Sequence, residues 1–169
     1  LLYSAIPSEL AIKKLNLNSQ KECGRIDFKP DDHRETFFYS NRGILAANDD
    51  FIVYAYCYKK QIDIYRVDDM KLHLRITDPS AKPEIRIGDF EHTKQYYVNV
   101  IATSRYIYAL LNGKDDSLSM EVLDFEGQPV AKYDFTIAPF LFDVDEVNGY
   151  MYGYNENYED YLLRYKINL

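Results

Sequence analysis

Three stretches of the sequence repeat one pattern of alternating apolar and aromatic residues, and this repeat limits the fold more than any other feature. The stretches are residues 47–76, 102–135 and 144–167. Aligned on their centres, they bring Tyr54, Tyr108 and Tyr152 to one position, each followed by a small residue: Ala55, Ala109 and Gly153. The offsets between the tyrosines are 54 and 44 residues, a spacing typical of propellers and solenoids. The repeat therefore predicts a row of similar β-sheet units.

The clearest predicted strand, Phe51–Tyr58, is apolar or aromatic on both of its faces. Val53 and Ala55 lie on one face, and Tyr54 and Tyr56 lie on the other, because successive strand residues point in opposite directions. An antiparallel sheet with one face in water would instead alternate between apolar and polar residues. We therefore expect each sheet to be covered on both sides, as sheets are when they pack face to face in a ring.

Each complete unit is expected to hold four antiparallel strands. Turn signals with glycine separate them, such as Asn112–Gly113 and Glu126–Gly127, because glycine readily accepts a positive φ, and Asn148–Gly149 is such a signal in the last unit. The strands expected for the two central units are 43–47, 51–58, 61–67 and 71–76, followed by 96–102, 106–111, 118–124 and 129–135.

The units at the two ends of the chain are incomplete in the sequence. Residues 1–28 predict only the end of a blade, with strands at 2–6, 10–17 and 22–28, and residues 140–169 predict a last blade that lacks its outer strand. Residues 41–77 and 96–136 predict one whole blade each. The expected fold is therefore an all-β propeller, of which this chain forms about three and a half four-stranded antiparallel blades. Unpaired edge strands favour association, so we expect the missing strands to come from elsewhere.

Composition narrows the classes of function. The 169 residues are 47% hydrophobic and 15% aromatic, with 17 tyrosines and no tryptophan, which suits pleated, half-buried surfaces. A formal net charge of −7 with scattered basic residues argues against a nucleic-acid partner. No apolar run reaches the length of a membrane span. The two cysteines, Cys23 and Cys57, match neither a disulfide framework nor a zinc site.

Three motifs in the second half of the chain match a known pattern. They are "YIYAL" at residues 106–110, "VLDFEGQPV" at 122–130 and "FDVDEVNGYMY" at 142–152. Together they resemble the C-terminal portion of the TolB-like six-bladed β-propellers common in Bacteroidetes, and the likeness covers roughly residues 41–169. This chain departs from those proteins in its length, which is about half of theirs.

The resemblance implies a compartment and a partner. Proteins of this type are exported or lipid-anchored, which implies a location in the periplasm or at the cell envelope. They usually close the ring by adding an N-terminal strand to the last blade. The partner implied here is therefore the remainder of the propeller, or a second chain that completes the ring.

Acidic side chains near two predicted turns raise the question of a metal. Asp49 and Asp50 precede one strand, and Asp143, Asp145 and Glu146 precede another. Carboxylates in a propeller channel could bind calcium or act as acid and base. An acidic residue before a tight hairpin more commonly accepts hydrogen bonds from the turn's own amides. We therefore predict neither a metal site nor a cofactor.

The residues predicted to bind a ligand lie in or beside the two long connections between units. They are His33, Arg34, Arg42, His92 and Tyr96. In propellers such loops surround the mouth of the central channel, where a protein or small-molecule ligand could bind. The three histidines lack the spacing of metal ligands.

No sequence signature of a nucleophile or a catalytic triad is present, and no catalytic residue is predicted. The sequence favours a non-enzymatic binding or scaffold propeller of the bacterial cell envelope, with the question of enzymatic activity open. The alternative hypothesis is a calcium-dependent propeller hydrolase or lactonase with its site in the central channel.

Overall fold

Four antiparallel sheets account for almost all the regular structure of the described residues. The computed structural model describes residues 1–5, 9–28, 39–81, 85–86, 89, 92–113, 117–158 and 162–169. Sheet I consists of β1 (Leu2–Ser4), β2 (Ala11–Asn16) and β3 (Lys21–Asp27). Sheet II consists of β4 (Gly43–Ala47), β5 (Phe51–Tyr56), β6 (Gln61–Arg66) and β7 (Leu72–Thr77). Sheet III consists of β8 (Tyr97–Ala102), β9 (Ile107–Asn112), β10 (Leu118–Leu123) and β11 (Pro129–Asp134). Sheet IV consists of β12 (Leu141–Asp145), β13 (Tyr150–Tyr154) and β14 (Leu163–Lys166).

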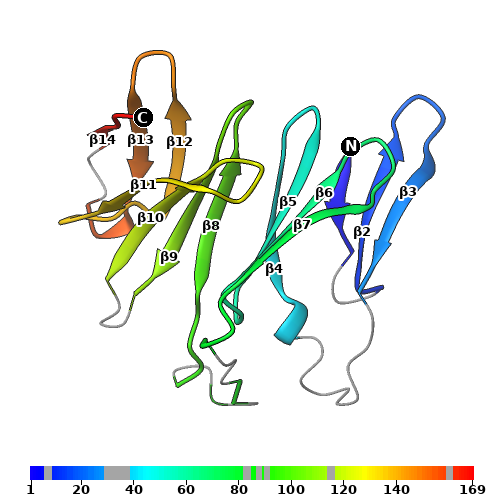
Figure 1. Ribbon diagram of the computed structural model, residues 1–169, viewed down its shortest axis with the longest axis horizontal. Coiled ribbons are helices and arrows are strands. Elements are labelled where there is room, and N and C mark those ends of the chain that lie inside the picture. The colour runs from blue at the N-terminus through cyan, green and yellow to red at the C-terminus, as the bar shows by residue number, and fades with distance from the viewer. Residues whose placement is uncertain are drawn as a thin grey trace.

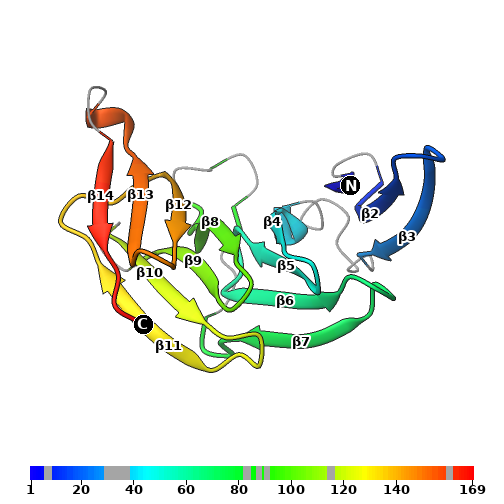
Figure 2. The same ribbon diagram turned by 90° about the horizontal axis from the view of Figure 1, so that it is seen from above.

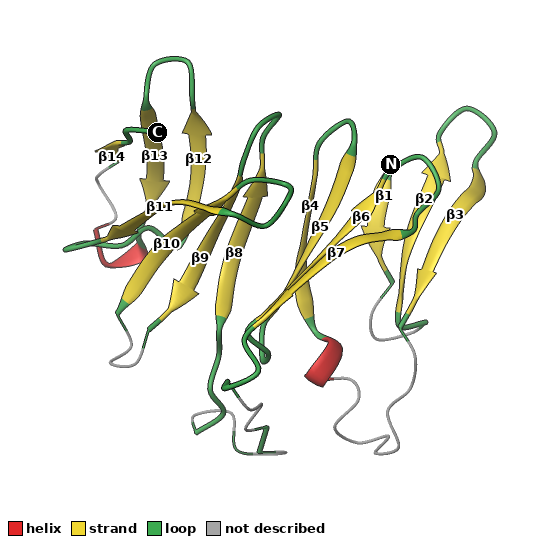
Figure 3. Cartoon of the chain, viewed as in Figure 1, coloured by secondary structure: helices red, strands yellow, loops and turns green. Residues whose placement is uncertain are grey.

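Helical structure is scarce in the described ranges. Residues 39–41 form a helical turn before β4, and a short 3-10 helix, η1 (Glu156–Tyr158), connects β13 toward β14 (Figure 3). The prediction of an all-β chain is therefore confirmed.

The sheets stand side by side in chain order and together form an arc (Figures 1 and 2). Seen from above, β4 and β8 line the inner side of the arc, whereas β7 and β11 lie on its outer side (Figure 2). Each sheet is a meander in which consecutive strands pair antiparallel. The two ends of the chain therefore lie in the two sheets at opposite ends of the arc.

Three apolar cores fill the spaces between neighbouring sheets. Between sheets I and II, Ile12 and Phe28 pack against Tyr54 and Tyr56. The other two cores have the same form and contain the following buried residues: Val53, Ile62, Ile64, Tyr97, Val100 and Ile107 between sheets II and III, and Tyr108, Leu110, Met120, Phe142 and Met151 between sheets III and IV. Both faces of sheets II and III are covered, as the apolar character of Phe51–Tyr58 predicts.

A shared irregularity identifies equivalent strands. The register shifts between Ile64 and Tyr65 in the β6–β7 pair, and between Val122 and Leu123 in the β10–β11 pair. The β2–β3 pair has the same shift between Lys14 and Leu15. Because bulges sit at fixed places in repeated sheets, β2 and β3 correspond to the third and fourth strands of sheets II and III.

The tyrosine alignment of the repeats is wrong by one residue. Ala47 pairs with Ile52 in sheet II, and Ala102 pairs with Ile107 in sheet III, so equivalent positions of these two sheets are 55 residues apart. Tyr54 accordingly faces sheet I, whereas Tyr108 faces sheet IV. A shift of one residue moves a side chain to the opposite face of its sheet.

A buried carboxylate ties together the side of sheet II that faces sheet I. Asp63 in β6 is 0% exposed and accepts five hydrogen bonds. Two of them come from Arg75, at 2.7 and 2.8 Å, and two come from the hydroxyls of Tyr56 and Tyr65, at 2.9 and 3.1 Å. The fifth comes from Gln61. A buried charge is tolerated only when it is paired and hydrogen-bonded in this way.

Removing this carboxylate should destabilise the protein strongly. Asp63→Ala leaves the Arg75 guanidinium and two buried hydroxyls without their acceptor, and we expect a loss of about 3–5 kcal/mol in the free energy of unfolding. Urea denaturation measures it. The matched control is Asp134→Ala, because Asp134 forms only an exposed ion pair with Lys132. Equal losses in the two variants would contradict the role assigned to Asp63.

At alkaline pH the buried tyrosines should ionise together, when the protein unfolds. Burial raises the pKa of Tyr54, Tyr56, Tyr97 and Tyr108 well above the ordinary tyrosine value of 10.0. A raised folded-state pKa contributes stability that is complete below pH 10 and is lost as the pH rises further, because only the unfolded chain then ionises. We expect tyrosinate absorbance from these residues to appear together with unfolding monitored by circular dichroism. Full ionisation of all 17 tyrosines in a folded protein would contradict this.

Candidate functional site

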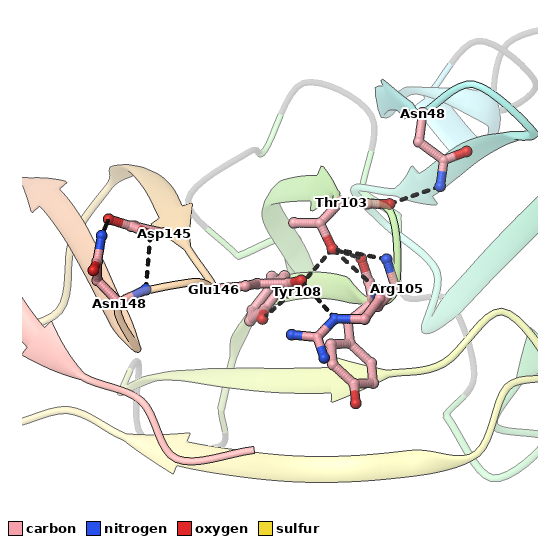
Figure 4. A network of polar contacts seen from close by, with 8 residues as sticks. Asn48, Thr103, Arg105, Tyr108, Asp145, Glu146 and Asn148 are labelled. Carbon is pink, nitrogen blue, oxygen red and sulfur yellow. Dashed lines mark hydrogen bonds and ion pairs between the residues drawn. The ribbon is translucent and has the colours of Figure 1, made fainter.

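The β4–β5, β8–β9 and β12–β13 turns lie at the same end of sheets II, III and IV, and their side chains join one sheet to the next (Figure 4). Asn48 begins the first turn. Its Oδ1 accepts hydrogen bonds from the backbone N–H groups of Asp50 and Phe51, at 2.9 and 2.7 Å. Its Nδ2 donates to the carbonyl of Thr103 in sheet III, at 2.6 Å. One side chain therefore closes its own turn and binds the neighbouring turn.

Thr103 repeats this arrangement one sheet further along. Its Oγ1 accepts hydrogen bonds from the backbone N–H groups of Arg105 and Tyr106, at 3.3 and 3.0 Å. It also donates to Oε1 of Glu146, in the β12–β13 turn, at 2.5 Å. We call Asn48, Thr103, Tyr108, Arg105 and Glu146 the turn network.

Glu146 is the centre of the turn network. Its side chain is only 10% exposed, and both carboxylate oxygens accept hydrogen bonds. Oε1 also accepts a hydrogen bond from the Tyr108 hydroxyl at 3.0 Å, and Oε2 accepts one from Arg105 Nε at 3.1 Å. The pKa of Tyr108 is raised, first by burial and then by the bond to this carboxylate. The pKa of Arg105 is raised by its bond to Glu146.

A cavity opens beside the turn network, between the β12–β13 turn and the segment after β14. Its volume is about 360 Å³. Its lining combines two cations, one carboxylate, two amides and several apolar groups: Arg105, Tyr106, Glu146, Val147, Asn148, Gly149, Lys166, Ile167, Asn168 and Leu169. The Arg105 guanidinium lies over the Tyr106 ring, 5.2 Å from its centroid. This size and this mixed lining are typical of a small-molecule site.

Two of the residues predicted to bind a ligand meet at the opposite end of the sheets. The backbone N–H of Cys57 donates to the Arg42 carbonyl at 2.9 Å, and the backbone N–H of Tyr96 donates to the Cys57 carbonyl at 2.7 Å. The amide of Asn112 donates to the Tyr96 carbonyl, and the buried Oδ1 of Asn112 has no hydrogen-bond partner in the described structure. A water or a ligand donor could satisfy that oxygen.

The other predicted ligand-binding residues are not brought to this point. His92 Nδ1 lies 2.6 Å from Asp89 Oδ1, on an exposed part of the connection before β8. His33 and Arg34 lie outside the described residues. A ligand site made by all five residues therefore stays a prediction.

The acidic residues near the turns act on the backbone. Asn48, rather than Asp49, occupies the capping position of the first turn. Asp143 accepts a bond from the N–H of Val144, and Asp145 accepts two bonds from Asn148. Within the described ranges, no three His, Cys, Asp or Glu side chains gather as a metal ion would require.

Sequence reasoning missed the connection between turns. The sequence indicates Glu146 only as one member of an acidic cluster and Tyr108 only as a repeat position, and it gives no signal for Arg105. A usable signal exists, because Asn48 and Thr103 each come directly after a predicted strand and three positions before an aromatic residue, Phe51 or Tyr106. That spacing marks the capping residue of each turn, but it does not show that the turns touch.

Comparisons with known proteins show a fold and no family. No family model matches the chain, and none of the curated proteins does. Among solved structures, the crystal structure of BamB from Moraxella catarrhalis is similar, with a TM-score of 0.54 and 10% sequence identity. The match covers 85% of this chain and 34% of the BamB chain, so this chain spans about a third of that protein. At this identity the likeness shows only the fold, a β-propeller arrangement of antiparallel sheets.

The structure contains, within its described ranges, no helix with the length and hydropathy that a membrane crossing requires.

The turn network predicts a specific loss of stability. Glu146→Ala removes the acceptor of the Thr103 and Tyr108 hydroxyls, and we expect unfolding to become easier by about 1–3 kcal/mol. Urea denaturation measures the change. Glu156→Ala is the matched control, because Glu156 is exposed in η1. A variant at Glu146 as stable as the control would show that the turns do not hold sheets III and IV together.

Proposed function

We propose that this chain is part of a non-enzymatic binding or scaffold propeller of the bacterial cell envelope. The ring is of the six-bladed, TolB-like type, and further sheets complete it. They come from the remainder of the propeller or from a second chain. The likeness to BamB, a β-propeller outer-membrane protein, supports the choice of compartment.

The uncovered face of sheet IV carries this proposal. In sheets II and III the face toward the next sheet is buried and apolar, with Ile62 and Val122 fully inaccessible. The same face of sheet IV has no neighbour among the described residues. Leu141 on this face is 64% exposed, and Tyr154, which pairs with it, is 41% exposed. Large apolar side chains that cluster on a surface usually mark an interface.

This face is also ordered by charge. The register places Asp143 beside Tyr152 and Arg164, and Asp145 beside Tyr150 and Lys166. An acidic row on β12, a tyrosine row on β13 and a basic row on β14 therefore run in parallel. Tyrosine and arginine are enriched in protein interfaces, and charged rows select a partner with the opposite order of charges. A further β-sheet, packed over these three rows, is the partner that we propose for this face.

The outward side of sheet I has a different character. Lys13 pairs with Glu9 at 2.5 Å and with Glu22 at 3.3 Å, and Arg25 pairs with Glu9 and Asp27 at 2.8 and 2.6 Å. These charges are already paired within the sheet, so this surface does not demand a charged partner. The two ends of the arc are therefore unlike each other, as they are when further sheets continue an incomplete ring.

The chemistry of the turn network supports a binding role over a catalytic one. A general base needs a free lone pair directed at its substrate. Both oxygens of Glu146 instead accept bonds from Thr103, Tyr108 and Arg105. The carboxylate is thus used to hold turns and to position a cation.

The proposal predicts that the isolated chain associates through its uncovered face. Light scattering of the purified chain at rising concentration should give a mass above 19.9 kDa. Leu141→Asp should return the chain to a monomer, because it places a charge on that face. The matched control is Val130→Asp, an apolar-to-acidic change at an exposed position of β11, which should leave the association unchanged.

One result would contradict the proposal. A stably folded species of 19.9 kDa at every concentration, with the same mass in Leu141→Asp, would show that this face needs no partner.

A further inference from the structure

We infer that the cavity beside Arg105 binds a small anionic ligand through a carboxylate or phosphate group. This inference deepens the proposed binding function and rests on it. The class of ligand assigned to the cavity is a small anion, and the assignment is based on the geometry around Arg105.

The Arg105 guanidinium has unused donors at the cavity. Its Nε donates to Glu146, while no hydrogen bond of the described structure uses its two Nη groups. The Arg105 side chain is 59% exposed, so these groups are open to a ligand. A guanidinium with both terminal nitrogens free matches a pair of anionic oxygens in a forked arrangement.

The guanidinium is fixed in place before any ligand arrives. Glu146 is immobilised by the hydroxyls of Thr103 and Tyr108, and it holds Arg105 by its Nε. The Tyr106 ring supports the guanidinium from one side, at 5.2 Å. A long side chain that is already ordered loses little conformational entropy on binding, so a preorganised arginine binds more tightly than a mobile one.

A second basic residue is part of the lining, although its side chain belongs to the basic row on the uncovered face of sheet IV. Lys166, on β14, forms no ion pair with any described residue. Within the cavity Glu146 pairs with Arg105, so the group that the cavity offers to an anion is the Arg105 guanidinium with its two Nη groups.

The rest of the lining suits a small polar molecule. Asn148 and Asn168 offer amides. Val147 and Ile167 offer apolar contacts. A volume of about 360 Å³ accepts a small organic acid or a phosphorylated metabolite.

Calorimetric titration tests the inference with two probes, sodium succinate and sodium phosphate, at constant ionic strength. We expect saturable binding of at least one probe, and the stronger probe identifies the anion as carboxylate or phosphate. Arg105→Gln should weaken binding by about tenfold or more. Lys132→Gln, which removes an exposed cation on β11, is the matched control and should bind as the parent chain does.

Two further variants separate a ligand contact from a structural effect. Arg105→Lys keeps the positive charge and loses the fork, so it should bind more weakly than the parent but more tightly than Arg105→Gln. Leu141→Asp, which blocks association, should bind the anion as the parent does, so that failure of one proposal does not imply failure of the other. Absence of saturable binding, or equal affinity in the parent and Arg105→Gln, would overturn the inference.

Discussion

The two inner sheets of this protein, sheets II and III, are apolar on both faces, and the arrangement of the chain follows from the need to cover them. A β-sandwich would solve the problem for one face of each sheet only. Stacking the sheets in a row covers both faces of every inner sheet, as the cores around Ile64 and Tyr108 show. Seen from above, that row of sheets follows an arc (Figure 2). The outward face of sheet IV has no covering sheet among the described residues, and we propose that this face binds a partner.

The turn network adds a polar connection to this apolar packing. Asn48 and Thr103 close their own turns and also bind the next turn, so the sheets are joined at the end that carries the β4–β5, β8–β9 and β12–β13 turns. Hydrophobic packing is non-directional and would permit neighbouring sheets to slide, whereas these bonds fix their relative height. Because Glu146 holds Arg105 as well, the contact that fixes the sheets also positions the cation at the cavity.

The sequence predicted the class of fold and most strands, because alternation and turn residues are local signals. β5 occupies residues 51–56 within the expected 51–58, and β10 occupies 118–123 within the expected 118–124. The registration of the repeats was not predictable from the tyrosines, because Tyr54 and Tyr108 look alike in sequence and face opposite ways. The candidate site was missed for another reason. Contacts such as Thr103 to Glu146 join residues far apart in the chain, and no local pattern records them.

The central claim is that these sheets are neighbouring sectors of a ring that the described residues do not complete. An experimentally determined structure of the species that the chain forms with its physiological partner tests this claim most directly. The account predicts another sheet packed over Tyr150, Tyr152 and Tyr154, and another strand hydrogen-bonded to the free edge of β14. A solvent-exposed tyrosine row in that species, with β14 still paired only to β13, would contradict it.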